Sequence, residues 1–476
     1  MRSPIDREGE CGMRYPVKVL QFGEGVFLRG FIDWMVEKMN DRGGFGGSIA
    51  VVKPRPGAFP EAYARQDFRY TVSLKGILDG GRVESRERIG CIDRLVNPYD
   101  DFDAYLAEAA NPDLVLVVSN TTESGIASSP SDRATDRPAP SFPGKLTQFL
   151  RARYEASGGK GLIIMPCELI ENNGGALRDL VVSHAEAWYA DPAFVSWLKE
   201  ANTWLDSLVD RIVTGYVEAE REAIRDAEGF DDELCVVAEP YHFLALRGSA
   251  SLESRLPFRA SGLNVTWAED ISPYRELKVR LLNGSHTLMA LCAPALGAAQ
   301  VRDCLVMPDL MAALRQYQLG ETIPTMAASK AECEAFLNSV LERFANPDLT
   351  HKLEGIAAKS VAKWEARVFP TVRSYASRHG RMPALGAFTL AALVDRYTRG
   401  PVPKDETPAI EWFANRTDAF EKDPGAAMAE ALSDSGPWGG RAKVEGLSEE
   451  TASRLVALRE KGMKAALLEA TADSKS

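Results

Sequence analysis

Short apolar runs recur through the first half of the chain with the spacing of a parallel β-sheet. They lie at residues 17–22, 49–52, 113–119 and 161–165. Strands buried on both faces have continuous apolar runs, and parallel strands need a helical crossover between them. A helical pattern through Phe31, Trp34 and Met35 follows the first run, and another at 145–156 precedes the fourth. The pattern predicts an α/β fold with a doubly wound sheet.

Other stretches of the chain depart from this alternation. Residues 70–74 and 82–89 alternate polar and apolar around Asp79-Gly80-Gly81, which predicts a hairpin insertion. Residues 193–213 are amphipathic with aromatic anchors. From Glu269 onward long helices are expected, at 308–317, 330–345, 385–398 and 449–469. We therefore predict two domains, 14–268 and a mainly α-helical 269–470.

Composition narrows the class of protein. The chain has 476 residues, 45% hydrophobic and 26% charged, with a formal charge of −11. That charge argues against non-specific binding to nucleic acid or to an anionic membrane. The seven cysteines include no CxxC pair, which indicates reduced thiols and no zinc site. Residues 1–12 lack an apolar signal core, so we expect a cytoplasmic protein, and Met13 is an alternative start.

The first apolar run leads directly into the turn Gly23-Glu24-Gly25 and then into a predicted helix. Free amides at the helix start, beside glycines without a β-carbon, would admit a pyrophosphate. Leu28 stands where GxGxxG has its third glycine, so an ordinary tight turn remains an alternative. With the predicted strands, this turn favours a Rossmann-like dinucleotide-binding domain.

The second strand ends in Lys53-Pro54-Arg55. An NAD site usually has an acidic residue here for the ribose hydroxyls, whereas basic residues suit the 2′-phosphate of NADP. The choice between NAD and NADP is open from these residues alone.

The segment Pro273–Pro294 predicts one helix that carries a lysine, a carboxamide and an imidazole. At about 100° per residue, Asn283 lies about 140° and His286 about 80° round from Lys278, so all three share one side. A lysine can exchange a hydroxyl proton, and a carboxamide can hold a developing oxyanion. Gly284 would admit a cofactor or another backbone. The alternative is a core helix with a snorkelling lysine and a hydrogen-bonded histidine.

The sequence KVRLLNGSH resembles the catalytic helix of the polyol-specific long-chain dehydrogenases, the mannitol dehydrogenase family. The resemblance extends to FGEGVFLRG, TTESG, CELIENNG and VDRI, which stand in family order, and covers about residues 17–470. It implies an NAD-linked, metal-independent oxidoreductase with Lys278 as general acid/base and Asn283 and His286 as its companions. The glycine loop and CELI segment are most similar to the branch that interconverts D-altronate and D-tagaturonate.

The resemblance also implies roles for individual residues. Those for the cofactor are Gly23, Gly25, Phe27, Arg29, Lys53, Thr122 and Glu123. Substrate contacts are expected from Asp210, His242, Lys363 and Arg367. Leu169 stands where mannitol dehydrogenases place an asparagine that helps to hold the substrate oxygen, so that part of the oxyanion site is absent or supplied elsewhere.

Several alternatives stay open. Asp210 is also compatible with a structural pair with Arg211, and Lys363 and Arg367 are also compatible with solvated helix charges. Fructuronate reductase or mannitol 2-dehydrogenase is the same-class alternative, and a non-catalytic cofactor-binding protein is the different-class one. We expect a small sugar acid as the partner, in a cleft between the two domains, and no nucleic acid or membrane. The oligomeric state is not determined by these patterns.

Overall fold

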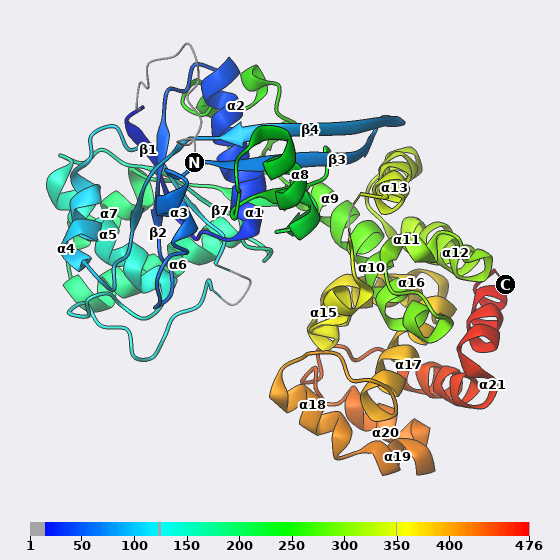
Figure 1. Ribbon diagram of the computed structural model, residues 1–476. Helices are drawn as coiled ribbons and strands as arrows, with labels where there is room; N and C mark the ends of the chain where they lie inside the picture. The colour runs from blue at the N-terminus through cyan, green and yellow to red at the C-terminus, as the bar shows by residue number, and fades with distance from the viewer. Residues whose placement is uncertain (1–14, 122–124, 349, 476) are drawn as a thin grey trace. The chain divides into compact units, whose positions relative to one another are not determined.

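The computed structural model describes residues 15–121, 125–348 and 350–475 (Figure 1). The chain divides between Ile271 and Ser272 into two compact units.

The first unit is built on a six-stranded sheet in the order β5-β2-β1-β6-β7-β8, with every neighbouring pair parallel. The strands are β1 (Val17–Phe22), β2 (Ser48–Val52), β5 (Ile92–Val96), β6 (Leu116–Ser119), β7 (Ile163–Pro166) and β8 (Thr203–Trp204). The sheet order reverses between β1 and β6, and doubly wound sheets bind ligands beyond the carboxyl ends of the strands at such a reversal.

Helices cover both faces of this sheet, and successive strand residues face opposite cores. Ile49 and Val51 of β2 pack with α2 residues such as Met35, whereas Ala50 and Val52 pack with the α5 side. The helices of this unit are α1 (Val26–Leu28), α2 (Trp34–Arg42), α3 (Ala62–Arg65), α4 (Phe102–Ala107), α5 (Phe142–Ala156), α6 (Asn173–Tyr189), α7 (Pro192–Glu200) and α8 (Glu218–Glu228). A π-helical segment, Arg29–Asp33, joins α1 to α2, and 3-10 turns lie at Glu108–Ala110, Ala250–Ser254 and Arg259–Ser261. Burial of both faces explains the continuous apolar runs of the sequence.

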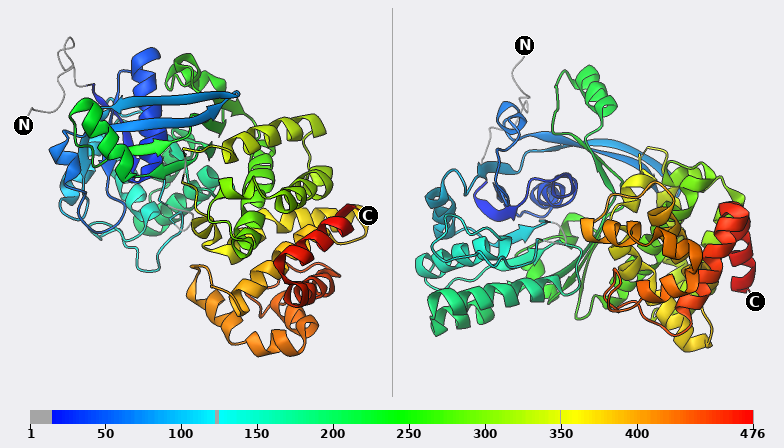
Figure 2. Two further views of the ribbon diagram at one scale, coloured as in Figure 1. Left: turned by 45° about the vertical axis from the view of Figure 1, so that its right-hand side comes forward. Right: turned by 90° about the horizontal axis from the view of Figure 1, so that it is seen from below.

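Two smaller sheets complete the first unit. One has the order β10-β11-β3-β4 and the other β13-β12-β9. Their strands are β3 (Tyr70–Leu78), β4 (Gly81–Ile89), β9 (Asp206–Asp210), β10 (Val213–Gly215), β11 (Val236–Ala238), β12 (Phe243–Arg247) and β13 (Val265–Ala268). The predicted hairpin is confirmed, and β3 and β4 form a long ribbon in each view (Figure 2).

The amphipathic stretch 193–213 forms two kinds of structure. Its first part belongs to α7, which ends at Glu200, and the remainder forms β8, β9 and the start of β10. Asn202 separates them, because its Oδ1 accepts from the amide of Leu162 (2.9 Å) and its Nδ2 donates to the Trp197 carbonyl (3.0 Å). Pairing with β12 therefore determines the structure of 206–210.

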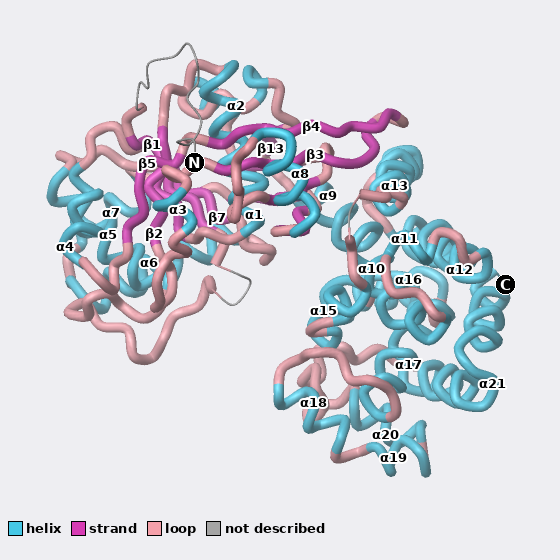
Figure 3. Tube along the Cα trace, viewed as in Figure 1, coloured by secondary structure: helices cyan, strands magenta, loops and turns pink. Residues whose placement is uncertain are grey.

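The described residues of the second unit form helices and no strand (Figure 3). Its helices are α9 (Ser272–Glu276), α10 (Gly284–Cys292), α11 (Val301–Cys304), α12 (Pro308–Gln316), α13 (Lys330–Phe344), α14 (Leu353–Ala357), α15 (Ser360–Arg367), α16 (Phe369–His379), α17 (Ala384–Thr398), α18 (Thr407–Ala414), α19 (Thr417–Lys422), α20 (Pro424–Ala431) and α21 (Leu447–Lys475). Two π-helical segments, Leu277–Asn283 and Tyr317–Thr322, and 3-10 turns at Ala293–Leu296 and Ile323–Thr325 connect some of them. The predicted fold class, a Rossmann-like α/β domain followed by a mainly α-helical one, is confirmed.

One buried core holds these helices together, and α17 lies within it, packed against α10 and α21. The last helix bends at Gly462, whose φ of 78° is non-helical, and its two parts run in different directions in Figure 1. The four predicted long helices match α12, α13, α17 and α21.

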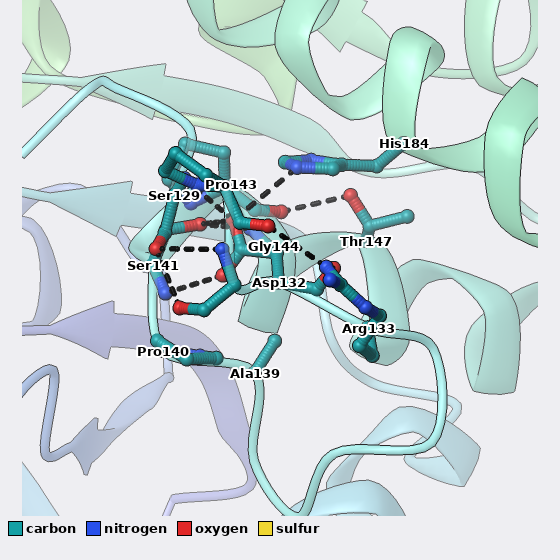
Figure 4. Close-up of polar contacts among 12 residues, drawn as sticks. Ser129, Asp132, Arg133, Ala139, Pro140, Ser141, Pro143, Gly144, Thr147 and His184 are labelled. Atoms are coloured by element: carbon teal, nitrogen blue, oxygen red, sulfur yellow. Dashed lines mark hydrogen bonds and ion pairs between the residues drawn. The ribbon is translucent and has the colours of Figure 1, made fainter.

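A buried carboxylate fixes the loop that precedes α5 (Figure 4). Asp132 accepts hydrogen bonds from the amide of Ser129 (2.8 Å), the amide of Ser141 (2.9 Å) and the hydroxyl of Ser141 (2.6 Å), and His184 Nε2 of α6 lies 3.3 Å away. Burial alone would raise the pKa of the Asp132 carboxyl, but these hydrogen bonds outweigh it and lower the pKa below its ordinary value. Asp132 thus connects the loop to α5 and α6.

Replacing this carboxylate should destabilise the first unit. In Asp132→Asn, an NH2 group replaces one of the carboxylate oxygens that accept hydrogen bonds from Ser129 and Ser141. We expect the free energy of unfolding to fall by about 1–3 kcal/mol, measured as a lower Tm. Because the native pKa is depressed, the stabilisation is present at neutral pH and is lost as the pH falls below about 4.

The matched control is Asp103→Asn, which makes the same substitution at an exposed aspartate. It removes the ion pair of Asp103 with Arg137 (2.7 Å). That change should cost no more than about 1 kcal/mol. Equal Tm values for the two variants at pH 7 would contradict the role given to Asp132.

Candidate active site

Lys278, Asn283 and His286 lie on one unbroken helical run from Ser272 to Cys292. The predicted helix is confirmed, but its centre, Leu277–Asn283, is π-helical rather than α-helical. In a π-helix the hydrogen bond joins residues five apart, so Lys278 and Asn283 are stacked more closely than an α-helix would place them. The three side chains are 5–9% exposed.

Arg280 connects the π-helical segment to neighbouring elements. Its guanidinium is buried, pairs with Glu276 and donates to Thr371 Oγ1 of α16 (3.2 Å). It also donates to the carbonyl of Thr325 (3.4 Å). These contacts hold the segment that carries Lys278 and Asn283 in place.

Gly284 allows the close approach that its place in the helix suggests. A β-carbon there would lie 2.9 Å from Tyr317 Oη and 3.1 Å from the backbone oxygen of Arg367. The approaching groups are thus the Tyr317 side chain and the backbone at the end of α15, against which α10 packs.

His286 lies among aromatic and basic side chains. Its ring stacks on Phe344 (centroids 4.5 Å apart) and meets the ring of His351 edge-on (4.7 Å). Burial, followed by the charges of His351, Arg367, Arg343 and Lys363, lowers the pKa of His286 well below its ordinary value. The imidazole is therefore neutral at pH 7, and its Nε2 has no hydrogen-bond partner among the described residues.

Lys363 and Arg367, both on α15, thus lie close enough to act on His286. Lys363 Nζ donates to the carbonyl of Ile356 (2.8 Å), and both side chains are half-buried. Burial and the charges of Arg343 and Lys363 also lower the pKa of His351, to about 4. The surroundings of His286 are therefore strongly positive.

In the first unit, the glycine turn follows β1 at the point where the sheet order reverses. Gly23 has a φ of +121°, which favours glycine, and a β-carbon on the exposed Gly25 would meet nothing within 4 Å. Phe27 stacks on Phe31 (5.1 Å). Open space over Gly25 and the helical amides that follow suit a pyrophosphate.

A cavity of about 410 Å³ lies beside this turn, lined by residues that include Glu24, Arg29, Tyr63 and Arg65. Arg29 is buried, donates to the carbonyl of Leu234 (2.8 Å), and its Nε has no partner among the described residues. Lys53, directly after β2, is buried and forms an ion pair with Glu24.

Asp210 and His242 lie in the first unit, where β9 pairs with β12. Asp210 is buried. His242 Nε2 accepts from the amide of Asn264 (2.9 Å), and its ring lies against Trp34 (4.8 Å). Burial and the charge of Arg211 lower the pKa of His242 to about 4, so this imidazole is neutral too.

Arg211 follows Asp210 directly at the end of β9. Its guanidinium donates to the carbonyls of Glu239 (2.9 Å) and Gly30 (2.8 Å) and lies over the Trp34 ring (4.2 Å).

The CELIENNG segment joins strand ends. Glu168 is buried and accepts from Ser119 Oγ (3.0 Å), and from the amide and hydroxyl of Thr121 (both 2.8 Å). Leu169 is half-buried. Thr122 and Glu123, the cofactor residues expected next to Thr121, lie outside the described residues.

Among the described residues, no group of three or more His, Cys, Asp or Glu side chains could hold a metal ion. Within the same ranges, no helix is long and apolar enough to cross a membrane. Six cysteines are buried and free; Cys11 lies outside the described part of the chain.

Comparison with known proteins gives the family. Residues 17–258 match the mannitol dehydrogenase Rossmann domain and residues 270–454 the mannitol dehydrogenase C-terminal domain. The chain belongs to the mannitol dehydrogenase family. The glycine turn and the Lys278 helix thus fall in separate domains of that family.

Relatives within the mannitol dehydrogenase family include several altronate oxidoreductases. That of Bacillus subtilis (strain 168) is 37% identical over 458 residues, 95% of each chain. That of Klebsiella pneumoniae (strain 342) is 35% identical over 477 residues, 97% of this chain and 99% of the relative. The relative from Halalkalibacterium halodurans is 41% identical over 386 residues, 80% of this chain and 75% of its own length.

Solved structures in this family share the fold at lower identity. The ternary complex of Pseudomonas fluorescens mannitol 2-dehydrogenase with NAD and D-mannitol has a TM-score of 0.77 at 21% identity, covering 96% of this chain and 94% of the other. A substrate-free D-sorbitol dehydrogenase has a TM-score of 0.76 at 22% identity, covering 95% of each.

Sequence reasoning missed three residues near the candidate groups. Arg343 and His351 lie next to His286 only because α13 and the following loop fold back on α10. Glu24 lies between the two glycines of the turn, at a position where the motif requires no particular residue. No sequence pattern predicts its ion pair with Lys53.

Three neutral histidines, His286 buried and His242 and His351 half-buried, should make the fold sensitive to acid. His242, His286 and His351 have native pKa values below the ordinary value of about 6.5, so the unfolded chain binds protons that the native chain does not. Stability should therefore fall as the pH drops from about 6.5 towards 4. Thermal melts across this range would measure it.

His351→Gln removes one such group and should make this fall shallower than in the unaltered protein. A Tm that stays constant or rises between pH 6.5 and 5 would contradict the assignment of neutral, buried imidazoles.

Proposed function

We propose that this protein is an NAD-dependent oxidoreductase that interconverts D-altronate and D-tagaturonate without a metal. The observation that carries the proposal is the buried set of Lys278, Asn283 and His286 beside a cluster of positive side chains. The altronate oxidoreductases at 35–41% identity support the substrate. The scattered cysteines support a cytoplasmic location.

The first unit suits the cofactor. Gly23 makes the tight turn with its positive φ, and Gly25 leaves space at the carboxyl end of β1, followed by helical amides that can receive a pyrophosphate. We propose Phe27 and Arg29 as cofactor contacts beside this turn, together with Thr122 and Glu123. When bound, a nicotinamide cofactor donates or accepts the hydride.

The second unit suits proton transfer. Lys278 Nζ would exchange the proton of the reacting hydroxyl, and the Asn283 carboxamide would donate to the oxygen as negative charge develops. The neutral His286 would orient Lys278 through its partnerless Nε2. No step in this arrangement needs a metal, since Lys278 and Asn283 supply the polarisation.

The positive surroundings of His286 suit a sugar acid better than a neutral polyol. A carboxylate removed from water needs cationic partners, and Lys363 and Arg367, with Arg343 next to them, provide such partners. Asp210 and His242 are the proposed substrate contacts from the first unit.

Removing the acid/base should abolish turnover and spare cofactor binding. Lys278→Met should reduce kcat for tagaturonate by at least the 10²–10⁴-fold typical of losing a general acid/base. Stopped assays of NADH oxidation measure the loss of turnover. Quenching of tryptophan fluorescence by NADH measures whether cofactor binding is retained.

Lys330→Met is the control, because Lys330 is 78% exposed at the start of α13 and the substitution changes charge by the same amount. It should keep normal kcat. Turnover by Lys278→Met close to that of the control would end the acid/base assignment.

The substrate class is tested by a panel of D-tagaturonate, D-fructuronate and D-fructose with NADH. A charge-assisted contact to the carboxylate contributes roughly 1.5–3 kcal/mol, and about 1.4 kcal/mol is tenfold, so tagaturonate should exceed fructose at least tenfold in kcat/KM. Lys363→Met should reduce this preference mainly through the KM for tagaturonate.

Lys359→Met is the matched control, since Lys359 precedes the same helix and pairs at the surface with Glu406 (2.8 Å). It should leave the preference unchanged. Equal efficiency of the unaltered enzyme with fructose and tagaturonate would replace this proposal by a mannitol 2-dehydrogenase, and a preference for fructuronate would identify a fructuronate reductase.

A further inference from the structure

The residues that follow β2 are basic, whereas an NAD enzyme usually has an acidic residue there. In doubly wound folds an acidic residue near this strand end meets the ribose hydroxyls of NAD, whereas a basic residue accommodates the 2′-phosphate of NADP. Here Val52 is followed by Lys53, and Arg55 stands two residues later. Sequence position alone would therefore favour NADP.

The structure shows that both cations are engaged. Lys53 Nζ forms an ion pair with Glu24 Oε1, and it lies 4.9 Å from the centroid of the Phe59 ring. Arg55 Nη2 donates to the carbonyl of Thr121 (3.2 Å). The Lys53 side chain is 11% exposed, so this ion pair is largely shielded from water.

The carboxylate reaches Lys53 from the neighbouring strand. Glu24 is the middle residue of the glycine turn after β1, and the amide of Gly23 donates to the carbonyl of Val52 (3.1 Å), which ties the turn to the end of β2. The hydroxyl of Tyr63 donates to the Glu24 carbonyl (3.4 Å) on the other side. Glu24 is 22% exposed at its side chain and lines the cavity beside the turn.

We propose that Glu24 determines the cofactor preference of this protein. The Glu24 carboxylate comes from the glycine turn, and it replaces the acidic residue that NAD enzymes usually have at the end of β2. It also holds the ammonium group of Lys53 in an ion pair. A 2′-phosphate would meet a like charge, and Lys53 would not be available to neutralise it. This inference rests on the proposed NAD-linked function.

Binding of NADH and NADPH, measured by calorimetry without substrate, tests the inference apart from turnover. The unaltered protein should bind NADH more tightly. Glu24→Gln removes the negative charge and releases Lys53, so the ratio of the two dissociation constants should move at least about tenfold towards NADPH. In Glu24→Gln/Lys53→Met this gain should largely disappear, because its source is the released ammonium.

Lys53→Met alone is a second variant that keeps the inference testable if Glu24→Gln does not fold. It leaves Glu24 without its cation, so NADPH binding should weaken relative to NADH by about threefold or more.

Glu61→Gln is the matched control for loss of a carboxylate beside the same cavity. Glu61 is exposed and pairs with Arg65 (3.1 Å), which also contacts Glu233 (2.5 Å), so the control should leave the ratio unchanged. A folded Glu24→Gln protein whose ratio stays within twofold of the unaltered one would overturn the role of Glu24 and leave the proposed function intact. If the unaltered protein binds neither dinucleotide, the proposed function fails, and this inference fails with it.

Discussion

Burial of both faces of the parallel sheet is the constraint on which the first unit depends. Helices fill both sides of β1, β2, β6 and β7, so polar side chains near the sheet can gather only where the strands end. Gly23 and Glu24 follow β1, Lys53 follows β2, and Thr121 and Glu168 follow β6 and β7. The cofactor turn and the groups that support it therefore share one edge.

Polar side chains at that edge form hydrogen bonds and ion pairs with one another. Glu168 accepts three hydrogen bonds from the end of β6, and Glu24 pairs with Lys53 across the ends of β1 and β2. A buried carboxylate or ammonium without a partner would destabilise the fold, so each of these residues constrains its neighbour. The charge that a cofactor meets is thus determined by pairs of residues and not by one position.

In the second unit, the three residues proposed for catalysis lie on a buried and largely apolar helix. Lys278, Asn283 and His286 lie in a core whose packing is continuous around α10 and α17. The backbone of Arg367 reaches Gly284, and the same helix brings Lys363 near His286. The positive charges of these side chains favour the neutral form of His286.

The sequence by itself determined the elements whose signal is local. Continuous apolar runs identified β1, β2, β6 and β7, period-two alternation identified the β3–β4 hairpin, and helical periodicity identified α12, α13, α17 and α21. The Lys-x4-Asn-x2-His spacing located the candidate catalytic helix, because neighbours on a helix are separated by few residues. Only the tertiary structure decided the strands after Asn202, the π-helical turn at Lys278, the Glu24–Lys53 pair and the approach of Arg343 and His351 to His286. These features join residues distant along the chain, or depend on pairing and burial that no local pattern encodes.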